Sequence, residues 1–199
     1  MKKIIVLAVL LALVSLVPGA AMADSIKGRL GVTGKVGFIV PSDNEAEFGF
    51  GTNHTDTGLV VGGGLLYGID DHFAAELDVT NSSFDSEIGD FDVTDISFGG
   101  QYRFTNMRDR RLVPYIGAGL DIISSDFDSD FGGRRHVDTT LGVHLSGGLD
   151  YFVEKHVALT AEAKVVLAPD ADITDDGFHS GSFDPTNFST TFGVRFFFN

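Results

Sequence analysis

The sequence contains no cysteine, no tryptophan and only five prolines, and it has half as many lysines and arginines as aspartates and glutamates. The absence of cysteine excludes disulfides, thiolate metal sites and a cysteine nucleophile. The formal net charge of −14 argues against a nucleic-acid-binding protein. Beyond residue 23, no apolar run approaches the roughly 20 residues that a membrane-spanning helix needs. No cofactor-binding motif is present either.

The first segment, MKKIIVLAVLLALVSLVPGAAMA, has two lysines, an apolar run from Ile4 to Val17 and small residues at Ala21 and Ala23. This pattern is typical of a secretory signal peptide. We expect cleavage after Ala23, which divides the chain into a signal peptide over 1–23 and one mature domain over 24–199. The protein is therefore predicted to be exported.

The mature sequence is rich in glycine and phenylalanine, and it is built from short segments in which apolar and polar residues alternate. A period of two is the signature of a β-strand with one apolar face. Eight such segments are predicted: Arg29–Val40, Gly58–Ile69, Phe73–Thr80, Asp95–Phe104, Leu112–Ile122, Thr140–Tyr151, Val157–Leu167 and Phe188–Phe198.

Such alternation fits either a soluble β-sandwich or barrel with an apolar core, or an outer-membrane barrel whose apolar face meets lipid. The lengths of the links favour the second, because they alternate between short and long. The short links are 70–72, 105–111 and 153–156, and the long links are 41–57, 82–92, 124–136 and 168–186. The predicted fold class is all-β: an eight-stranded antiparallel up-and-down transmembrane β-barrel with short periplasmic turns and long external loops.

Aromatic residues on the predicted lipid face support the same fold. Seven of them lie beside the short links or the carboxyl end, where they would form one interfacial ring. Phe38, Phe84 and Phe188 lie near the long links and can supply the opposite ring. The seven are Tyr67, Phe73, Tyr102, Phe104, Tyr151, Phe196 and Phe198.

The carboxyl end, STTFGVRFFFN, places aromatic residues where a soluble protein has little use for them. Thr191, Gly193, Phe196 and Phe198 form a pattern that resembles the signal by which outer-membrane barrels are recognised for assembly. Phe197, between the two lipid-facing rings, is expected to face inward and close that end of the barrel.

Three stretches resemble the OmpW family of small outer-membrane barrels: YGIDDHFAAEL (67–77), VPYIGAGLDI (113–122) and FDPTNFSTTFGVRFFF (183–198). The resemblance extends in general pattern to OmpA- and OmpX-type eight-stranded barrels. It implies an integral protein of the Gram-negative outer membrane that contacts lipid and lipopolysaccharide, is inserted by the barrel-assembly machinery and acts as a narrow, porin-like channel. The implied solutes are small hydrophobic molecules.

The predicted inward face carries many charges, because charged residues take the polar positions of nearly every strand. Two interpretations remain open: a packed core of ion pairs, including Glu76 or Glu162 with Arg103, Lys164 or Arg195, and a permeable or gated path. The predicted lumen residues are Arg29, Lys35, Glu76, Asp78, Asp95, Arg103, Asp121, Asp138, Asp150, Glu162, Lys164 and Arg195.

Two alternatives to transport follow from other features. The long links are strongly acidic, so the barrel can be an anchor whose external loops serve envelope integrity or adhesion and bind divalent cations. A lipid A-modifying enzyme is suggested by His144 and Ser146, a base and a hydroxyl on one side of a strand. Both residues, however, are predicted to face the lumen, where bilayer lipid does not reach them. We therefore predict a protein without enzymatic activity or a catalytic site.

Overall fold

The computed structural model describes residues 25–42, 57–86, 89–105, 111–129, 134–137, 139–169, 171–175 and 178–198. Within these ranges, side chains are described except those of 84–91, 126–137 and 171–183. The predicted signal peptide and Asp138 lie outside the described residues. No helix in the described ranges has the length and hydropathy needed to cross a membrane.

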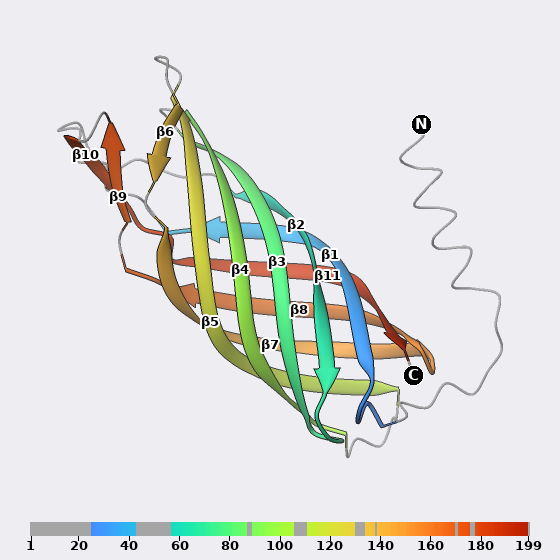
Figure 1. Cartoon of the computed structure of the whole chain (residues 1–199). Helices are drawn as coiled ribbons and strands as arrows, with labels where there is room; N and C mark the ends of the chain where they lie inside the picture. Colours follow the sequence, from blue (N-terminus) through green and yellow to red (C-terminus); the bar gives the residue numbers. More distant parts are fainter. Residues whose placement is uncertain are drawn as a thin grey trace, which may run out of the picture.

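Eight antiparallel strands form a closed barrel (Figure 1), which confirms the predicted fold class. Each strand pairs with its neighbours along the wall; β1 pairs with β11, and β5 pairs with β7 to complete the ring. The barrel strands are β1 (Leu30–Pro41), β2 (Gly58–Gly68), β3 (Phe73–Ser86), β4 (Gly89–Arg103), β5 (Leu112–Ser129), β7 (Thr140–Glu154), β8 (Val157–Leu167) and β11 (Asn187–Phe198).

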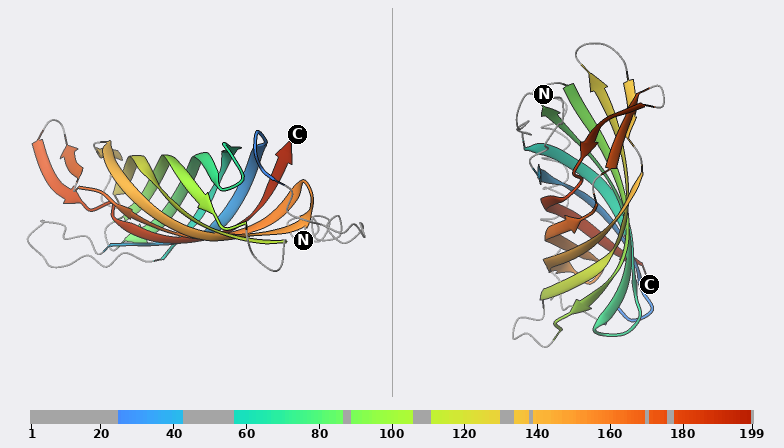
Figure 2. Two further views of the ribbon diagram at one scale, coloured as in Figure 1. Left: turned by 90° about the horizontal axis from the view of Figure 1, so that it is seen from below. Right: turned by 90° about the vertical axis from the view of Figure 1, so that its left-hand side faces the viewer.

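Three short strands, β6 (Arg134–Val137), β9 (Ala171–Asp175) and β10 (Phe178–Phe183), extend the sheet beyond one end of the barrel. β6 pairs with the last part of β5 and with β9, and β9 pairs with β10. Figure 2 shows the β9–β10 hairpin, in orange to red, projecting past the curved wall. We call this the loop end, and the opposite end, with the three short links and Phe198, the turn end.

The prediction of long loops over 82–92, 124–136 and 168–186 was therefore wrong in part. β3 continues to Ser86 and β4 begins at Gly89, opposite it. The predicted long link over 82–92 is therefore mostly paired strand, and β3 and β4 form a tight hairpin. β5 continues to Ser129, and β6, β9 and β10 lie within the other two links. These acidic segments pair as strands because neighbouring backbones satisfy their N–H and C=O groups whatever the side chains.

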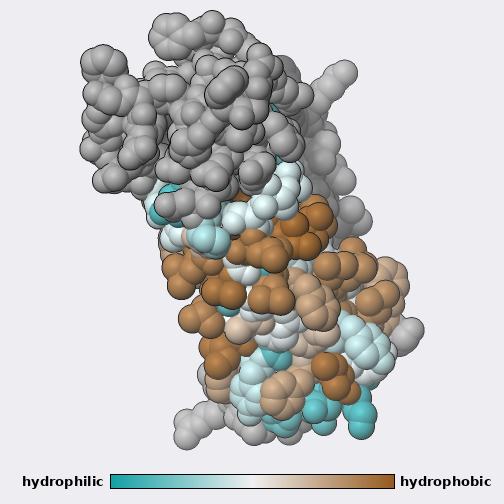
Figure 3. Space-filling model, turned by 60° about the vertical axis from the view of Figure 1, so that its left-hand side comes forward, coloured by the Kyte–Doolittle hydropathy of each residue, from teal (hydrophilic) through white to brown (hydrophobic). Residues whose placement is uncertain are grey.

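Apolar side chains cover the outside of the barrel. Leu, Val, Ile, Phe and Tyr residues at alternate positions of all eight barrel strands are exposed on the outer surface. Figure 3 shows those on one face of the barrel as a broad apolar band. Near the turn end, Tyr102 contacts Phe73 and Phe104 edge to face, and the ring centroids are 5.1 Å apart in each pair. The residues of both predicted interfacial belts face outward, although the side chain of Phe84 is not among those described.

The first short turn is held by a carboxylate. Asp70 accepts hydrogen bonds from the backbone N–H groups of His72 and Phe73, both at 2.7 Å. These bonds stabilise the charged form, so they hold the pKa of Asp70 below its ordinary value. The turn at the amino-terminal side needs Gly28, whose φ of 72° is strained for other residues.

A cluster of apolar side chains fills the barrel at the turn end. Phe197 stacks on Phe152 with a centroid distance of 5.5 Å, and the Arg29 guanidinium lies 5.3 Å from the Phe197 ring centroid. Phe197 therefore faces inward, as its place in the alternation predicts. We call this cluster the plug; it consists of Ile26, Leu66, Ala74, Val113, Phe152, Ala158 and Phe197.

The plug gives a direct stability prediction. Phe197 is fully buried, and replacing a buried Phe by Ala costs about 3–5 kcal/mol, so Phe197→Ala should lower the free energy of unfolding by that amount. Phe192→Ala on the same strand is the control, because Phe192 is 57% exposed on the outer face and fluid lipid can close around the shortened side chain. Guanidinium titration in lipid vesicles measures both; equal losses would contradict the plug.

Candidate functional site

The structure places the predicted charged lumen residues that it describes, all except Asp138, inside the barrel. Their side chains come from seven strands and from Arg29 just before β1, and they are buried or nearly so. Ten of them, all but Arg29, form two groups of ion pairs. The arginine cluster, nearer the turn end, contains Glu76, Arg103, Asp150 and Arg195; the lysine cluster contains Lys35, Asp78, Asp95, Asp121, Glu162 and Lys164.

Asp150 is the centre of the arginine cluster. Its Oδ2 accepts hydrogen bonds from Arg103 Nη2 at 2.6 Å and from Arg195 Nη1 at 2.9 Å. Arg195 also donates through Nη2 to Glu76 at 2.8 Å, which is one of the ion pairs that the sequence suggested. The side chain of Gln101 links both sides, since it donates to Glu76 and accepts from Arg103. Four strands are thus connected through one network of buried charges.

Tyr115 lies between the two clusters. The guanidinium carbons of Arg103 and Arg195 are 5.7 and 5.8 Å from its ring centroid, within cation–π range. Its hydroxyl donates to Glu162 Oε2 at 3.0 Å. A ring in this position fills the barrel cross-section between the clusters, as expected when eight strands leave room only for side chains.

The lysine cluster consists of two ammonium groups, each between carboxylates. Lys35 Nζ lies 2.8 Å from Asp78 and 3.3 Å from Glu162. Lys164 Nζ lies 2.8 Å from Asp95 and 2.7 Å from Asp121. A Cβ on Gly64 would overlap the carboxylate of Asp78, so the glycine on β2 leaves the space that this ion pair occupies.

His144 and Ser146 both lie in the interior. His144 Nδ1 is 2.8 Å from Asp121 Oδ2, and the ring fits against Gly99 and Gly119, where a Cβ would approach it to 3.1 Å and 2.7 Å. Ser146 lies against Gly117 on β5. The histidine therefore belongs to the charged interior, away from the lipid-facing surface.

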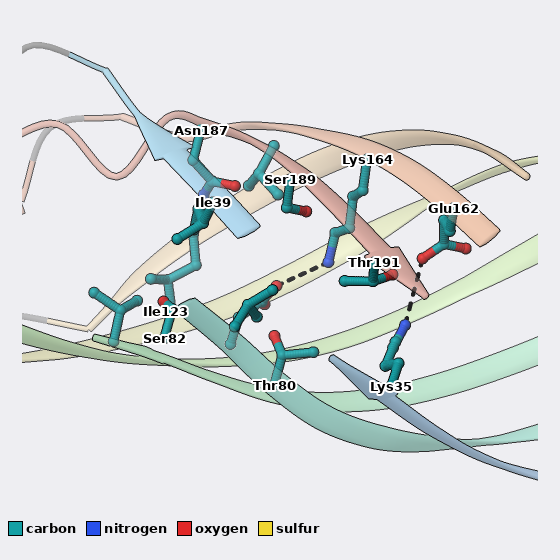
Figure 4. Close-up of a pocket in the computed structure, with 14 residues that line it drawn as sticks. Lys35, Ile39, Thr80, Ser82, Ile123, Glu162, Lys164, Asn187, Ser189 and Thr191 are labelled. Atoms are coloured by element: carbon teal, nitrogen blue, oxygen red, sulfur yellow. Dashed lines mark hydrogen bonds and ion pairs between the residues drawn. The ribbon is translucent and has the colours of Figure 1, made fainter. Parts of the chain in front are cut away.

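A cavity of about 30 Å³ lies on the loop-end side of the lysine cluster (Figure 4). Its floor is formed by Lys35, Asp95, Glu162 and Lys164, and hydroxyl and amide groups of Thr80, Ser82, Asn187, Ser189 and Thr191 also line it. We call it the outer cavity. Its aliphatic wall consists of five inward-facing side chains: Ile39, Val60, Val93, Ile123 and Val166.

The residues of the predicted assembly signal lie on both faces of β11. Thr191 is buried inside the barrel, whereas Phe196 and Phe198 are exposed on the outer surface, where their rings contact edge to face at 4.8 Å. Gly193 allows β11 to approach β1 closely, since a Cβ there would overlap the carbonyl oxygen of Gly34. Recognition by an assembly machinery stays a prediction.

Sequence reasoning did not single out the aliphatic wall. The sequence nevertheless indicates it. Side chains two residues apart in a strand share a face, and the neighbours of Ile39, Val60 and Val166 at that spacing face inward. An aliphatic residue in such a position is an exception within an otherwise polar face. Alternation places Gln101 and Tyr115 on the inward face, but their contacts depend on strands far apart in sequence.

The arginine cluster makes the second prediction. Asp150→Asn removes the charge that neutralises two buried guanidinium groups, so we expect the free energy of unfolding to fall by about 3–5 kcal/mol. Asp92→Asn is the matched control, because Asp92 is exposed on the outer face of β4, where it accepts a hydrogen bond from the exposed hydroxyl of Ser83 at 2.7 Å. Denaturant titration in vesicles measures both, and a loss below about 1 kcal/mol for Asp150→Asn would contradict the described role.

Comparisons with known proteins agree with this architecture. The crystal structure of OprG from Pseudomonas aeruginosa matches with a TM-score of 0.71 at 15% identity, covering 89% of this chain and 99% of OprG. The solid-state NMR structure of AlkL in lipid bilayers matches with a TM-score of 0.63 at 15% identity, covering 91% and 95%. The Neisserial surface protein NspA matches with a TM-score of 0.62 at 19% identity, covering 86% and 98%. No curated protein matches the sequence.

OprG and AlkL are small OmpW-like barrels of eight strands, so the resemblance seen in the sequence is confirmed at the level of the fold. The family model described as outer membrane protein beta-barrel domain matches residues 9–196, nearly the whole chain. The chain is therefore a member of the outer-membrane β-barrel protein family, and an integral protein of the outer membrane.

Proposed function

We propose that the protein is a narrow, porin-like channel that admits small hydrophobic molecules from the external side into the barrel. The observation that carries this proposal is the aliphatic wall of the outer cavity. Five apolar side chains face inward in the loop-end half of a barrel whose inward positions are otherwise mostly polar. Apolar side chains that face water contribute no favourable free energy, whereas an apolar solute that binds beside them buries apolar surface and is stabilised.

The turn-end half of the interior has a different character. The plug and the arginine cluster occupy it, and the fully buried rings of Phe152 and Phe197 stack there. A solute that enters from the loop end meets the lysine cluster first. Onward passage therefore needs either movement of these side chains or exit between strands into the bilayer, and entry is the step that the geometry favours.

Export and assembly complete the proposal. Residues 1–23 serve as a cleaved signal peptide, and Thr191, Gly193, Phe196 and Phe198 are read by the barrel-assembly machinery. The turn end then faces the periplasm and the loop end the lipopolysaccharide, in keeping with the general orientation of such barrels. The mass of the protein purified from outer membranes checks the cleavage, because processing after Ala23 leaves a chain beginning at Asp24; an unprocessed mass would exclude it.

Filling the outer cavity tests the transport proposal. Val60 is 4% exposed and lines the cavity, so Val60→Trp should obstruct it and lower uptake of a small hydrophobic solute by about tenfold. Val61→Trp is the control, since Val61 is 53% exposed on the opposite face of the same strand and its Trp would meet lipid. A substitution at Gly64 would not test obstruction of the interior alone, because any side chain there would also displace Asp78 from its ion pair with Lys35.

Uptake of a radiolabelled short alkane or arene into cells that lack the native protein and express each variant at equal outer-membrane levels is the measurement. The proposal predicts uptake by wild type and Val61→Trp and a loss in Val60→Trp. If Val60→Trp takes up solute as fast as wild type, the outer cavity is not part of the path.

A second candidate is a barrel that anchors a working external surface. The filled turn-end interior and the extension formed by β6, β9 and β10 beyond the barrel favour it. In this function the acidic external segments support envelope integrity or adhesion, with divalent cations as partners. Uptake in wild-type cells equal to that in cells without the protein would favour the anchor over the channel. We propose no enzymatic role, since His144 bonds Asp121 in the interior.

A further inference from the structure

The charges at the outer cavity are already paired with one another. Lys35 and Lys164 contribute the two cations of its lining, and Asp95 and Glu162 contribute the two anions. Lys35 Nζ lies 3.3 Å from Glu162 Oε1 (Figure 4), and Lys164 Nζ lies 2.8 Å from Asp95 Oδ2. An ion of either sign that entered would lose its hydration and find each counter-charge bonded. The lining therefore favours uncharged solutes.

Apolar and hydroxyl side chains alternate across the strands that line the outer cavity. On β3, Ser82 lies between Val60 of β2 and Val93 of β4 in the register of the sheet. On β11, Ser189 lies opposite Ile39 of β1. All five side chains line the cavity, and side chains directly opposite each other on antiparallel strands are about 5 Å apart. One small molecule can therefore contact an apolar side chain and a hydroxyl group together.

The hydroxyl groups give the cavity a preference among uncharged solutes. A hydroxyl carries one donor and two acceptor sites, so Ser82 can accept a hydrogen bond from a solute whichever way its own hydrogen points. In solution, water occupies a polar cavity of this kind. An alkane that displaces the water leaves the hydroxyl group unpaired, whereas an alcohol replaces the lost hydrogen bond. The best solute therefore combines one hydroxyl group with an alkyl chain.

The size of the outer cavity fits the head of a short alcohol. About 30 Å³ holds about two water-sized groups, such as a hydroxyl and the carbon that bears it. The rest of a short alkyl chain would extend toward the loop end along the aliphatic wall.

We propose that the outer cavity binds short aliphatic alcohols in preference to alkanes and to ions of either sign, with Ser82 as the residue that determines the preference for a hydroxyl group. The solute hydroxyl donates to Ser82 Oγ, and the alkyl chain packs on Val60 and Val93. This inference rests on the proposed function, because it assigns a solute class to the same cavity.

NMR titration of the full mature protein in lipid nanodiscs tests the preference, with labelled isoleucine methyl groups as reporters at pH 7. The methyl groups of Ile39 and Ile123 report binding in the cavity. Those of Ile96 and Ile122, which are 41% and 47% exposed on the outer wall, report solute dissolved in the lipid. The probes are propan-1-ol, 1-chloropropane, propan-1-amine and propanoate. Propan-1-ol should move the cavity methyl signals with a dissociation constant about tenfold lower than that of the other three.

Two adjacent serines on β3 supply the variant and its control. Ser82→Ala removes the hydroxyl group that accepts from the solute, so it should bring the affinity for propan-1-ol down to that for 1-chloropropane. Ser83→Ala should keep the wild-type order, because the Ser83 hydroxyl is exposed on the outer face and donates to Asp92.

The outcomes separate the two proposals. If another probe binds in the cavity as tightly as propan-1-ol, or if Ser82→Ala keeps the tenfold preference, the specificity is wrong while the channel stands on its uptake result. If propan-1-ol moves only the signals of Ile96 and Ile122, the cavity does not bind it and the inference fails. If Val60→Trp also leaves uptake unchanged, both proposals fail. The comparison of the four probes on wild type needs no variant, so it decides the solute class even if Ser82→Ala does not fold.

Discussion

Pairing of every backbone N–H and C=O group within the wall is the constraint on which this structure depends. In the hydrocarbon core of a membrane no water can satisfy an open strand edge, so the first strand must close on the last. β1 pairs with β11 along its whole length, from Leu30 opposite Phe198 to Pro41 opposite Asn187. Closure in turn fixes two environments, with lipid outside and a narrow space inside, and the alternation of side chains follows from it.

The narrow interior then determines how charge is arranged. Arg103, Asp150 and Arg195 come from β4, β7 and β11, and their ion pairs connect opposite parts of the wall. Since none of these side chains reaches bulk water, each charge needs a partner from another strand. The same requirement spaces the glycines, because Gly64, Gly99 and Gly119 leave the volume that Asp78 and His144 occupy. The arginine cluster and the apolar plug fill the turn-end half, and the aliphatic wall lines part of the loop-end half.

Alternation predicted the eight barrel strands and the inward or outward direction of their side chains, since the period of two is a local property of the sequence. The position of Phe197 inside the plug could be predicted in the same way. The ion-pair partners could not be predicted. Lys35 pairs with Asp78 and Glu162 because strand tilt and register bring β1, β3 and β8 to the same depth. Tilt and register depend on several strands together, so no single segment of the sequence indicates them. The acidic segments beyond the barrel were mistaken for loops, since their pairing depends on the backbone of neighbouring strands rather than on apolar patterning.

The plug also joins the segment before the first barrel strand to the last barrel strand. Ile26 precedes the first strand, Phe197 is near the end of the last, and both belong to one apolar cluster. The amino-terminal segment is held there by the bond from Gly28 N–H to the Gly68 carbonyl oxygen at 2.7 Å and by the contact of Ser25 with Asp71. The plug is therefore complete only when β11 has paired with β1, so closure of the wall and filling of the turn end occur together. A chain whose β11 has not yet paired lacks both the closed wall and the Phe197 ring of the plug.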